Sequence, residues 1–173
     1  MENPSAFPMG EPNDGFAQYF VGQSYLAPVL ETPQIAIHNV TFEPGCRNNW
    51  HIHHNAAQVL IAVGGCGYYQ IEGQEPKELK AGQAVCIPAD TKHWHGAAPG
   101  ESCSHLAFMV PAGDPASMSN EWLEPGGAGA YGHGDSRWMP KPTANLPEVC
   151  CSYMEGHPAK VGWPFLLFRA ITV

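Results

Sequence analysis

Two stretches of the chain decide the fold that we expect: residues 44–64, PGCRNNWHIHHNAAQVLIAVG, and residues 82–96, GQAVCIPADTKHWHG. Each stretch contains two histidines separated by one residue: His51 and His53, and His93 and His95. Residues two apart on a β-strand project from the same face, so each pair would present its imidazole rings side by side. A Gly/Pro turn precedes each pair, and a strand hairpin separates them. We therefore expect a β protein with two histidine pairs on its strands.

The composition favours short strands joined by many turns. The chain has 173 residues, of which 44% are hydrophobic and only 14% charged, and it contains 19 glycines and 17 prolines. That length suffices for one domain with a hydrophobic core, and the many turn formers disfavour long helices. A surface for nucleic acid or for an anionic membrane needs clustered Lys and Arg, and the net charge of −8 argues against both partners.

We expect a cytoplasmic protein with reduced cysteines. No apolar stretch is long enough to span a bilayer, and residues 1–16 lack the basic start and apolar core of a secretory signal. The six cysteines lack CxxC spacing and lie mostly within apolar runs, which favours free thiols over a disulfide framework.

Strand signals recur about every ten residues, as in a sandwich or barrel. A hairpin or an edge strand is expected over residues 16–30, where Gly22 and Pro28 interrupt two apolar runs. The other strands are expected at residues 35–42, 50–53, 58–63, 67–73, 76–82, 84–87 and 104–110.

The composition divides the chain into three parts: an N-terminal arm at residues 1–15, a β domain at 16–124, and a Gly/Pro-rich tail at 125–173. The tail opens with the run GGAGAYGHGD and shows no clear periodicity before Pro164. We expect it to be irregular, either disordered or adding one strand from its final apolar run, and we give it no catalytic role.

The histidine pairs have the geometry of two halves of a metal site. A first-row divalent ion binds imidazole nitrogens that converge from rigid elements, with an oxygen donor and an open position if it is to catalyse. His51 and His53 meet the first need, and the side-chain oxygen of Gln58 offers a neutral donor. His93 reaches the same face if the two segments pack across a barrel. The alternative is a set of exposed polar residues or hydrogen-bonded core histidines, but two such segments in equivalent contexts favour a metal.

The two motifs resemble those of the cupins. The pattern G-x5-H-x-H-x4-Q-x5-G at residues 45–64 resembles the first cupin motif, and G-x5-P-x-D-x2-H at residues 82–93 resembles the second. The resemblance covers roughly residues 35–110 and implies an all-β, double-stranded β-helix, the cupin jelly-roll barrel. It also implies metal ligands at four positions: His51, His53, Gln58 and His93.

Two positions depart from the usual cupin motifs. Gln58 stands where the first motif usually has glutamate, which removes a negative charge and leaves a bound metal more electrophilic. Ala97 stands where the second motif usually has asparagine. Both departures point away from the most familiar cupin dioxygenases without excluding oxygen chemistry.

A closer resemblance is to small bacterial cupins that carry W-H-x-H…Q and K-H-W-H-G-A, here residues 50–58 and 92–97. These include manganese-dependent cupin hydroxynitrile lyases and carboxymuconolactone-decarboxylase-like cupins. The resemblance implies catalytic roles for His95 and His105 as acid or base beside the metal. His38 is added only because strand alternation would turn it toward the same interior. A structural role is the alternative for each of these three histidines.

The preferred function is a metal-dependent lyase that acts on a small hydroxy or carbonyl compound. In its hydroxynitrile-lyase version, the metal polarises the substrate oxygen and a histidine moves the proton. The alternatives are a sugar-acid or uronate isomerase, an iron-dependent dioxygenase, and a non-catalytic cupin that binds a small ligand. Only Arg47 and Lys92 supply cationic side chains near the motifs, which weakens the sugar-acid alternative.

The expected cofactor is one divalent transition metal, with manganese preferred and iron, nickel, cobalt or zinc as alternatives. The expected partners are a small-molecule substrate and further copies of the chain in a homodimer or homotetramer, with residues 16–30 as a candidate contact.

Overall fold

The computed structural model describes residues 2–126, so the predicted tail beyond residue 126 lies outside the described residues. Strands dominate this part of the chain, and its only helical segments are two 3-10 turns, η1 (Asp14–Tyr19) and η2 (Pro115–Ser117). Within the same residues, no helix has the length and apolar character needed to cross a membrane. The predicted all-β fold is confirmed.

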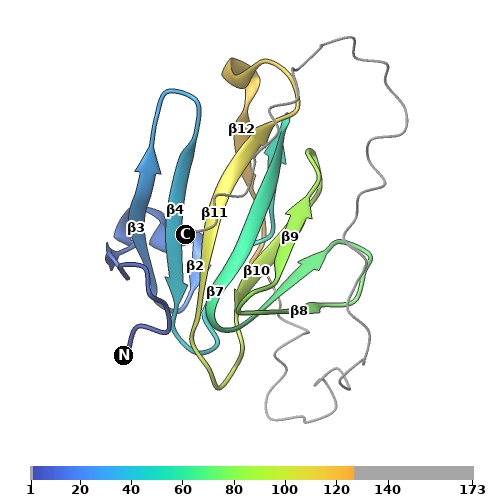
Figure 1. Cartoon of the computed structure of the whole chain (residues 1–173). Helices are drawn as coiled ribbons and strands as arrows, with labels where there is room; N and C mark the ends of the chain where they lie inside the picture. The colour runs from blue at the N-terminus through green and yellow to red at the C-terminus, as the bar shows by residue number, and fades with distance from the viewer. Residues whose placement is uncertain (1, 127–173) are drawn as a thin grey trace, which may run out of the picture. The chain divides into compact units, whose positions relative to one another are not determined.

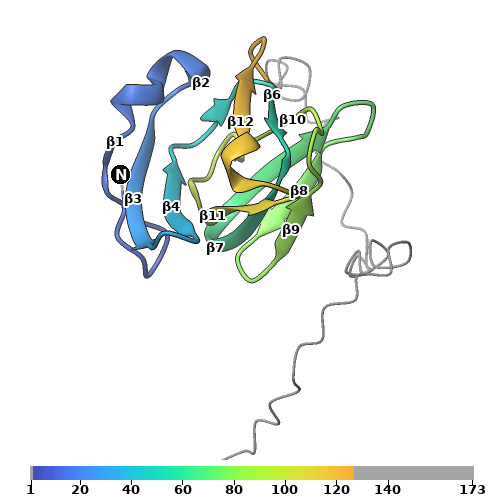
Figure 2. The ribbon, with the colours of Figure 1, turned by 90° about the horizontal axis from the view of Figure 1, so that it is seen from above.

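Two curled sheets face each other, and the long strand β7 (Ala56–Ile71) belongs to both. In the first sheet, seen face-on in Figure 1, β7 lies between β9 (Ala84–Ile87) and β11 (Cys103–Pro111), followed by β4 (Ala36–Phe42), β3 (Ser24–Glu31) and β1 (Glu11–Pro12). In the second sheet, β7 lies between β8 (Lys77–Lys80) and β10 (His93–Ala97). Strand β10 pairs with β5 (Arg47–Asn48) and β6 (His51–His54), which pair in turn with β2 (Phe20–Val21) and β12 (Ser119–Trp122). Figure 2 shows the two sheets curving around a common interior, which is the predicted jelly-roll barrel.

Strand β7 passes from one sheet to the other at its glycines. Residues 56–65 pair with β11, and residues 67–71 pair with β10. Gly65, between these segments, has φ of 64°, and a Cβ there would collide with the carbonyl oxygen of Ser102. Only glycine fits this position, since other residues rarely adopt positive φ and there is no room for a side chain. Before the bend, burial alternates along the strand, and Gln58 and Leu60 are both buried on the same face.

Most of the predicted strands are confirmed, two expectations are corrected, and one strand was missed. Of the two alternatives for residues 16–30, the hairpin is wrong, because residues 16–19 end η1 and β2 and β3 lie in different sheets, with Gly22 at φ of 89° between them. The other alternative, an edge strand, is met by β2, which ends its sheet. The strands expected at 58–63 and 67–73 are one continuous strand, β7. Strand β12 was not predicted, because its sequence SNEW lacks the β-branched alternation of a strand.

The interior is unusually polar. Apolar clusters form around Phe42 and Cys103 and around Leu60 and Ile87, and the cysteines at 46, 66, 86 and 103 are free thiols, as predicted. Yet the largest fully buried side chains also include three histidines and two asparagines: His51, His93, His105, Asn39 and Asn48. Burying a polar side chain costs free energy unless it finds a partner, so these residues require an explanation.

Candidate metal centre

Three histidines from two neighbouring strands converge inside the barrel. His51 and His53 project from one face of β6, and His93 begins β10, directly opposite His51 in the antiparallel register. One ring nitrogen of each histidine lies within 4.8 Å of those of the other two, and all three side chains are buried. The structure thus brings together three of the four predicted ligands, in a group that could hold one metal ion.

Asp90 of the second motif joins the turn before β10 to the turn after β6. Its backbone N–H donates to the carbonyl of His53 at 3.0 Å, and its carboxylate lies 3.0 Å from Nδ1 of His54 and 3.4 Å from the backbone nitrogen of Asn55. Asn55 and Asp90 both have φ of 58°, which Asn and Asp adopt more readily than other non-glycine residues. Asp90 thus ties the loop that leads into His93 to the end of β6.

Each of the three histidines is held in one tautomer by a carbonyl oxygen. A carbonyl oxygen only accepts, so the facing Nδ1 carries the proton and Nε2 keeps its lone pair. The Nδ1 distances are 2.9 Å from His51 to the backbone oxygen of Asn49, 2.6 Å from His53 to Oδ1 of Asn120, and 2.8 Å from His93 to the backbone oxygen of Thr91. Such partners of the second ring nitrogen are typical of histidines that bind metal through the first.

Gln58, the fourth predicted ligand, lies against the same nitrogens. Its Oε1 is 2.9 Å from Nε2 of His93. Since both Oε1 and the unprotonated Nε2 are acceptors, they repel unless a cation lies near both or the amide rotates to present its NH2 group. Adjacent ligand atoms about 2.1 Å from one ion would be about 3 Å apart, so the observed separation suits a shared metal. The donor set therefore fits a divalent transition ion.

Electrostatics keep the three imidazoles neutral, as metal ligands must be. Burial lowers the pKa of His93 to about 4 and the pKa of His53 below its usual value. Burial and then the neighbouring His93 hold the pKa of His51 well below 6.5. The buried Nε2 of His53 has no hydrogen-bond partner among the described residues, so its lone pair is available to a ligand.

Strand β12 supports two of the three histidines, and sequence reasoning missed it. Its pairing with β6 places Asn120 opposite His53 and Trp122 opposite His51. Asn120 accepts from the His53 ring, and the Trp122 ring packs on His51 with centroids 4.9 Å apart. Tyr19 of η1 stacks on Trp122 at 4.5 Å. The one available signal was that Asn120 and Trp122 are two residues apart, like the histidines they contact.

The predicted acid–base residues lie beside the three histidines. His95 follows His93 by two residues on β10, and its ring centroid is 5.5 Å from that of His51. Nδ1 of His95 is 3.2 Å from Nε2 of His105, which projects from β11. The ring of Phe42 contacts both rings, at centroid distances of 5.8 and 5.3 Å. Burial lowers the pKa of His105 to about 4, and burial followed by His105 holds the pKa of His95 well below its usual value.

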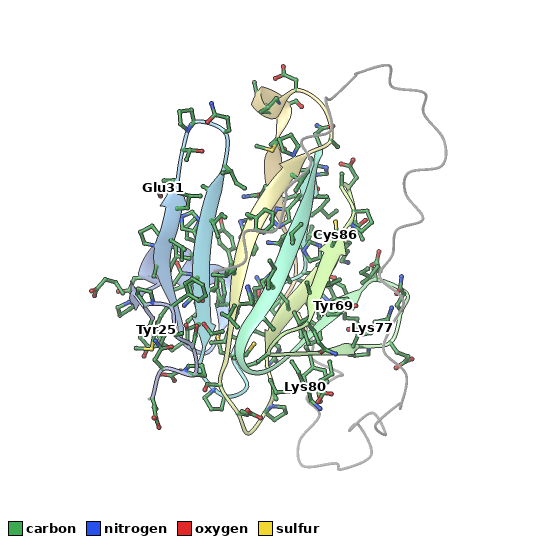
Figure 3. The ribbon with its side chains drawn as sticks, viewed as in Figure 1. Tyr25, Glu31, Tyr69, Lys77, Lys80 and Cys86 are labelled. Atoms are coloured by element: carbon green, nitrogen blue, oxygen red, sulfur yellow. The ribbon has the colours of Figure 1, made fainter. Side chains whose placement is uncertain are left out.

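Two other histidines have different surroundings. His38 shares a face of β4 with Phe42, as predicted from strand parity, but its side chain is 32% exposed and its Nε2 lies 3.5 Å from Glu31, which Figure 3 labels on β3. His54 faces outward, where it bridges Asp90 and Glu121 at 3.0 and 2.8 Å. Hydrogen bonds to these two carboxylates raise the pKa of His54, and Glu121 contributes more than Asp90. We assign neither residue to the metal centre.

The free energy of unfolding of the metal-free protein should fall as the pH drops below 6.5. His93 and His105 have pKa values of about 4 when folded, against 6.5 when unfolded, so the unfolded chain binds more protons between these values. Their contribution is present above 6.5 and is lost as the pH falls toward 4. Urea unfolding across this window should show about 1.4 kcal/mol per pH unit for each such histidine. A slope that His105→Gln leaves unchanged would contradict this assignment.

Asn120→Ala should weaken divalent-metal binding about 10- to 100-fold, because His53 loses the acceptor that orients its ring. Asn120→Asp keeps an acceptor and adds negative charge, so it should bind metal at least as tightly as the wild type. Calorimetric titration of the metal-free proteins with Mn²⁺ and Zn²⁺ measures both effects. Ser119→Ala is the matched control, since Ser119 is an exposed neighbour on the same strand. Equal losses in Asn120→Ala and Ser119→Ala would refute the role of Asn120.

Comparisons with known proteins agree with this architecture. The family model described as Cupin domain matches residues 38–110. An (R)-mandelonitrile lyase from Granulicella tundricola is 42% identical over 98 residues, which cover 55% of this chain and 74% of that protein. A cupin-like protein from Thermotoga maritima is 31% identical with a TM-score of 0.63, over 70% of this chain and 90% of that one.

A more distant structure supports the fold alone. It is a cupin 2 conserved barrel domain protein from Rhodopseudomonas palustris, 17% identical with a TM-score of 0.54, over 65% of this chain and 74% of that one. The histidine motifs on β6 and β10 stand within the matched region of the family model. The chain therefore belongs to the cupin family.

Proposed function

We propose that this cupin is a metal-dependent lyase that cleaves a small cyanohydrin into a carbonyl compound and cyanide. The observation that carries the proposal is the contact between two sets of residues: a three-histidine group with Gln58, and a hydrogen-bonded pair, His95 and His105, beside it. The relative named (R)-mandelonitrile lyase, 42% identical over the matched region, directs the choice of substrate class.

The first set would hold the metal. His51, His53 and His93 offer three unprotonated nitrogens, and Gln58 offers a neutral oxygen. A bound divalent ion would supply Lewis-acid polarisation of a substrate oxygen. Three imidazoles and one amide add no charge of their own, so the ion would keep its full positive charge. The set suits manganese, our preferred metal, and also iron, cobalt, nickel or zinc.

The histidine pair would handle the proton. Cleavage requires the hydroxyl of the cyanohydrin to lose its proton, the O–H electron pair to form the carbonyl, and the C–C electron pair to leave with cyanide, which then takes up a proton. An imidazole kept neutral by burial can accept the hydroxyl proton and later return it to cyanide. His95 is the better placed of the pair, since its ring is close to those of both His51 and His93, with centroids 5.5 and 6.2 Å away.

A sugar-acid substrate would need a cationic side chain to bind its carboxylate, and Lys92, the cation nearest the second motif, does not fill that role. Nζ of Lys92 lies 2.6 Å from Glu124 and 3.0 Å from Glu72, so its charge is already matched by two carboxylates. Such an ammonium group is poorly suited to recognise a substrate carboxylate. This arrangement favours a small, uncharged substrate.

The metal-loaded wild type should cleave mandelonitrile, and His95→Gln should lower kcat about 10²- to 10⁴-fold while metal content stays unchanged. Release of benzaldehyde, followed by its absorbance, measures the reaction. His54→Gln is the control, since His54 lies next to the ligand His53 but faces outward toward Asp90 and Glu121. Wild-type protein with bound metal that cleaves neither mandelonitrile nor smaller cyanohydrins would refute the proposal.

A further inference from the structure

The outer side of the first sheet is apolar along the adjoining strands β9, β7 and β11. In the part of β7 that belongs to this sheet, buried side chains that face the interior alternate with half-buried ones that face outward. The register places Val59 opposite Phe108 and Ile61 opposite Leu106 on the outward side. Val59 also lies opposite Cys86, which Figure 3 labels on β9. We call these residues, together with the next outward position of β11, the outer apolar face: Val59, Ile61, Cys86, Leu106, Phe108 and Val110.

One end of the same side is covered by the N-terminal arm, and there the outward side chains are polar. Nδ2 of Asn39 donates to the carbonyl oxygen of Pro8 at 2.8 Å, and the Ser104 hydroxyl donates to Oδ1 of Asn39 at 2.9 Å. On β7, a Cβ at Gly64 would collide with the carbonyl oxygen of Pro4. Asn39 and Ser104 are fully buried under this cover. The chain thus satisfies the polar residues that it covers itself.

Away from the arm the pattern is the reverse, because the outward residues there are apolar and Val110 is 45% exposed. An antiparallel sheet with one face in water normally alternates apolar and polar residues along each strand. The runs QVLIAV in β7 and SHLAFMV in β11 are instead nearly continuous in apolar residues, which is typical of strands buried on both faces. A contiguous exposed apolar patch of this kind marks an interaction site.

The position and chemistry of the face favour one occupant. The outward residues of β9, β7 and β11 in this sheet carry no charge, so the face offers nothing to a charged ligand. The tail that follows Gly126 leaves the described domain from the other sheet, because Gly126 packs against the backbone of Asn48 and its carbonyl accepts from Nε of Arg47, both residues of β5. A second copy of the chain presents an identical uncharged sheet face, which suits face-to-face packing.

We propose that the outer apolar face is the contact of a homodimer, in which two copies pack their first sheets together about a twofold axis. Two sheets pack in this way about 10 Å apart, with their strands inclined by about 30°. A twofold axis brings the same patch of both copies together, so one apolar face is sufficient for both. This contact replaces the one expected over residues 16–30, except for its end at Leu30.

The size of the sheet is enough for a specific contact. Strands β9, β7, β11, β4 and β3 are neighbours, and at about 4.8 Å per strand and about 3.4 Å per residue they form a flat area of roughly 24 by 24 Å. Two such faces cover roughly 1,100 Å², which is the lower end of the range for specific interfaces. We therefore expect a dimer that dissociates on dilution.

The contact lies on the reverse side of two strands that carry site residues. Val59 follows the predicted ligand Gln58 on β7, and Leu106 follows His105 on β11. Packing against a second copy would hold both strands without adding a residue to the site. The proposal rests neither on a bound metal nor on the lyase function, so its test is independent of both.

Sedimentation velocity of the full chain, from roughly micromolar to roughly millimolar concentration, measures the association. The wild type should pass from monomer to dimer. Val110→Glu should raise the dissociation constant of the dimer at least about tenfold, and Val110→Glu/Cys86→Glu should raise it further, because unpaired carboxylates would be buried in the contact. Both positions are exposed in the single chain, so circular dichroism of these variants should match that of the wild type.

Val21→Glu is the matched control, since Val21 is a 38% exposed valine on β2 of the second sheet. Its dissociation constant should equal that of the wild type. A wild type that stays monomeric at every concentration would overturn the proposal. A dimer that Val21→Glu weakens and Val110→Glu does not would also overturn it, and would place the contact within residues 16–30.

The reactivity of Cys86 separates a second copy from the tail as the occupant. The rate at which iodoacetamide modifies Cys86, followed by mass spectrometry of its peptide, should fall as the wild-type protein is concentrated. In Val110→Glu the rate should stay high over the range in which the wild type becomes protected. Protection of Cys86 that is the same at every concentration in a monomeric chain would show that the chain covers its own face, which contradicts the dimer.

Discussion

The arrangement of this site depends on one repeated interaction, the hydrogen bond from Nδ1–H of a buried histidine to a carbonyl oxygen. His51, His53 and His93 each make it, to oxygens that belong to a backbone turn or to the side chain of Asn120. The bond sets the tautomer, fixes the ring plane and leaves the Nε2 lone pairs directed into a small space. Without a cation these lone pairs form a cluster of mutually repelling acceptors inside the barrel. A divalent cation bound among them would accept these electron pairs, and this is the basis of the metal centre that we propose.

The barrel provides this geometry through connections between distant parts of the chain. Asp90 joins the two motif turns. Strand β12, which comes last among the described strands, pairs with β6 from the first motif. Because β12 carries both Asn120 and Trp122, its docking orders His53 and His51 together. Binding of a metal and docking of β12 should therefore favour each other, since each is easier once the histidines are held in place.

The sequence was informative wherever strand periodicity or a motif placed residues on one face. The alternation of His51 with His53 and the two motifs predicted the barrel and the grouping of three histidines with Gln58, and the structure brings these side chains together. Their binding of a metal stays a prediction. The contacts of Asn48 with His95 and of Asn120 with His53 could not be predicted in this way. Each contact depends on pairing between strands that are far apart in the sequence. The polar stretch SNEW also carries no strand signal of its own.

The metal content of the protein tests the central claim most directly. Protein purified without a histidine tag, as wild type and as the double variant His51→Ala/His53→Ala, is measured by elemental analysis after growth with manganese, iron and zinc supplied. The account predicts about one divalent transition ion per wild-type chain and almost none in the variant, provided that the variant remains folded by circular dichroism. A wild-type chain that stays free of metal even after reloading would contradict the metal centre and every catalytic role built on it.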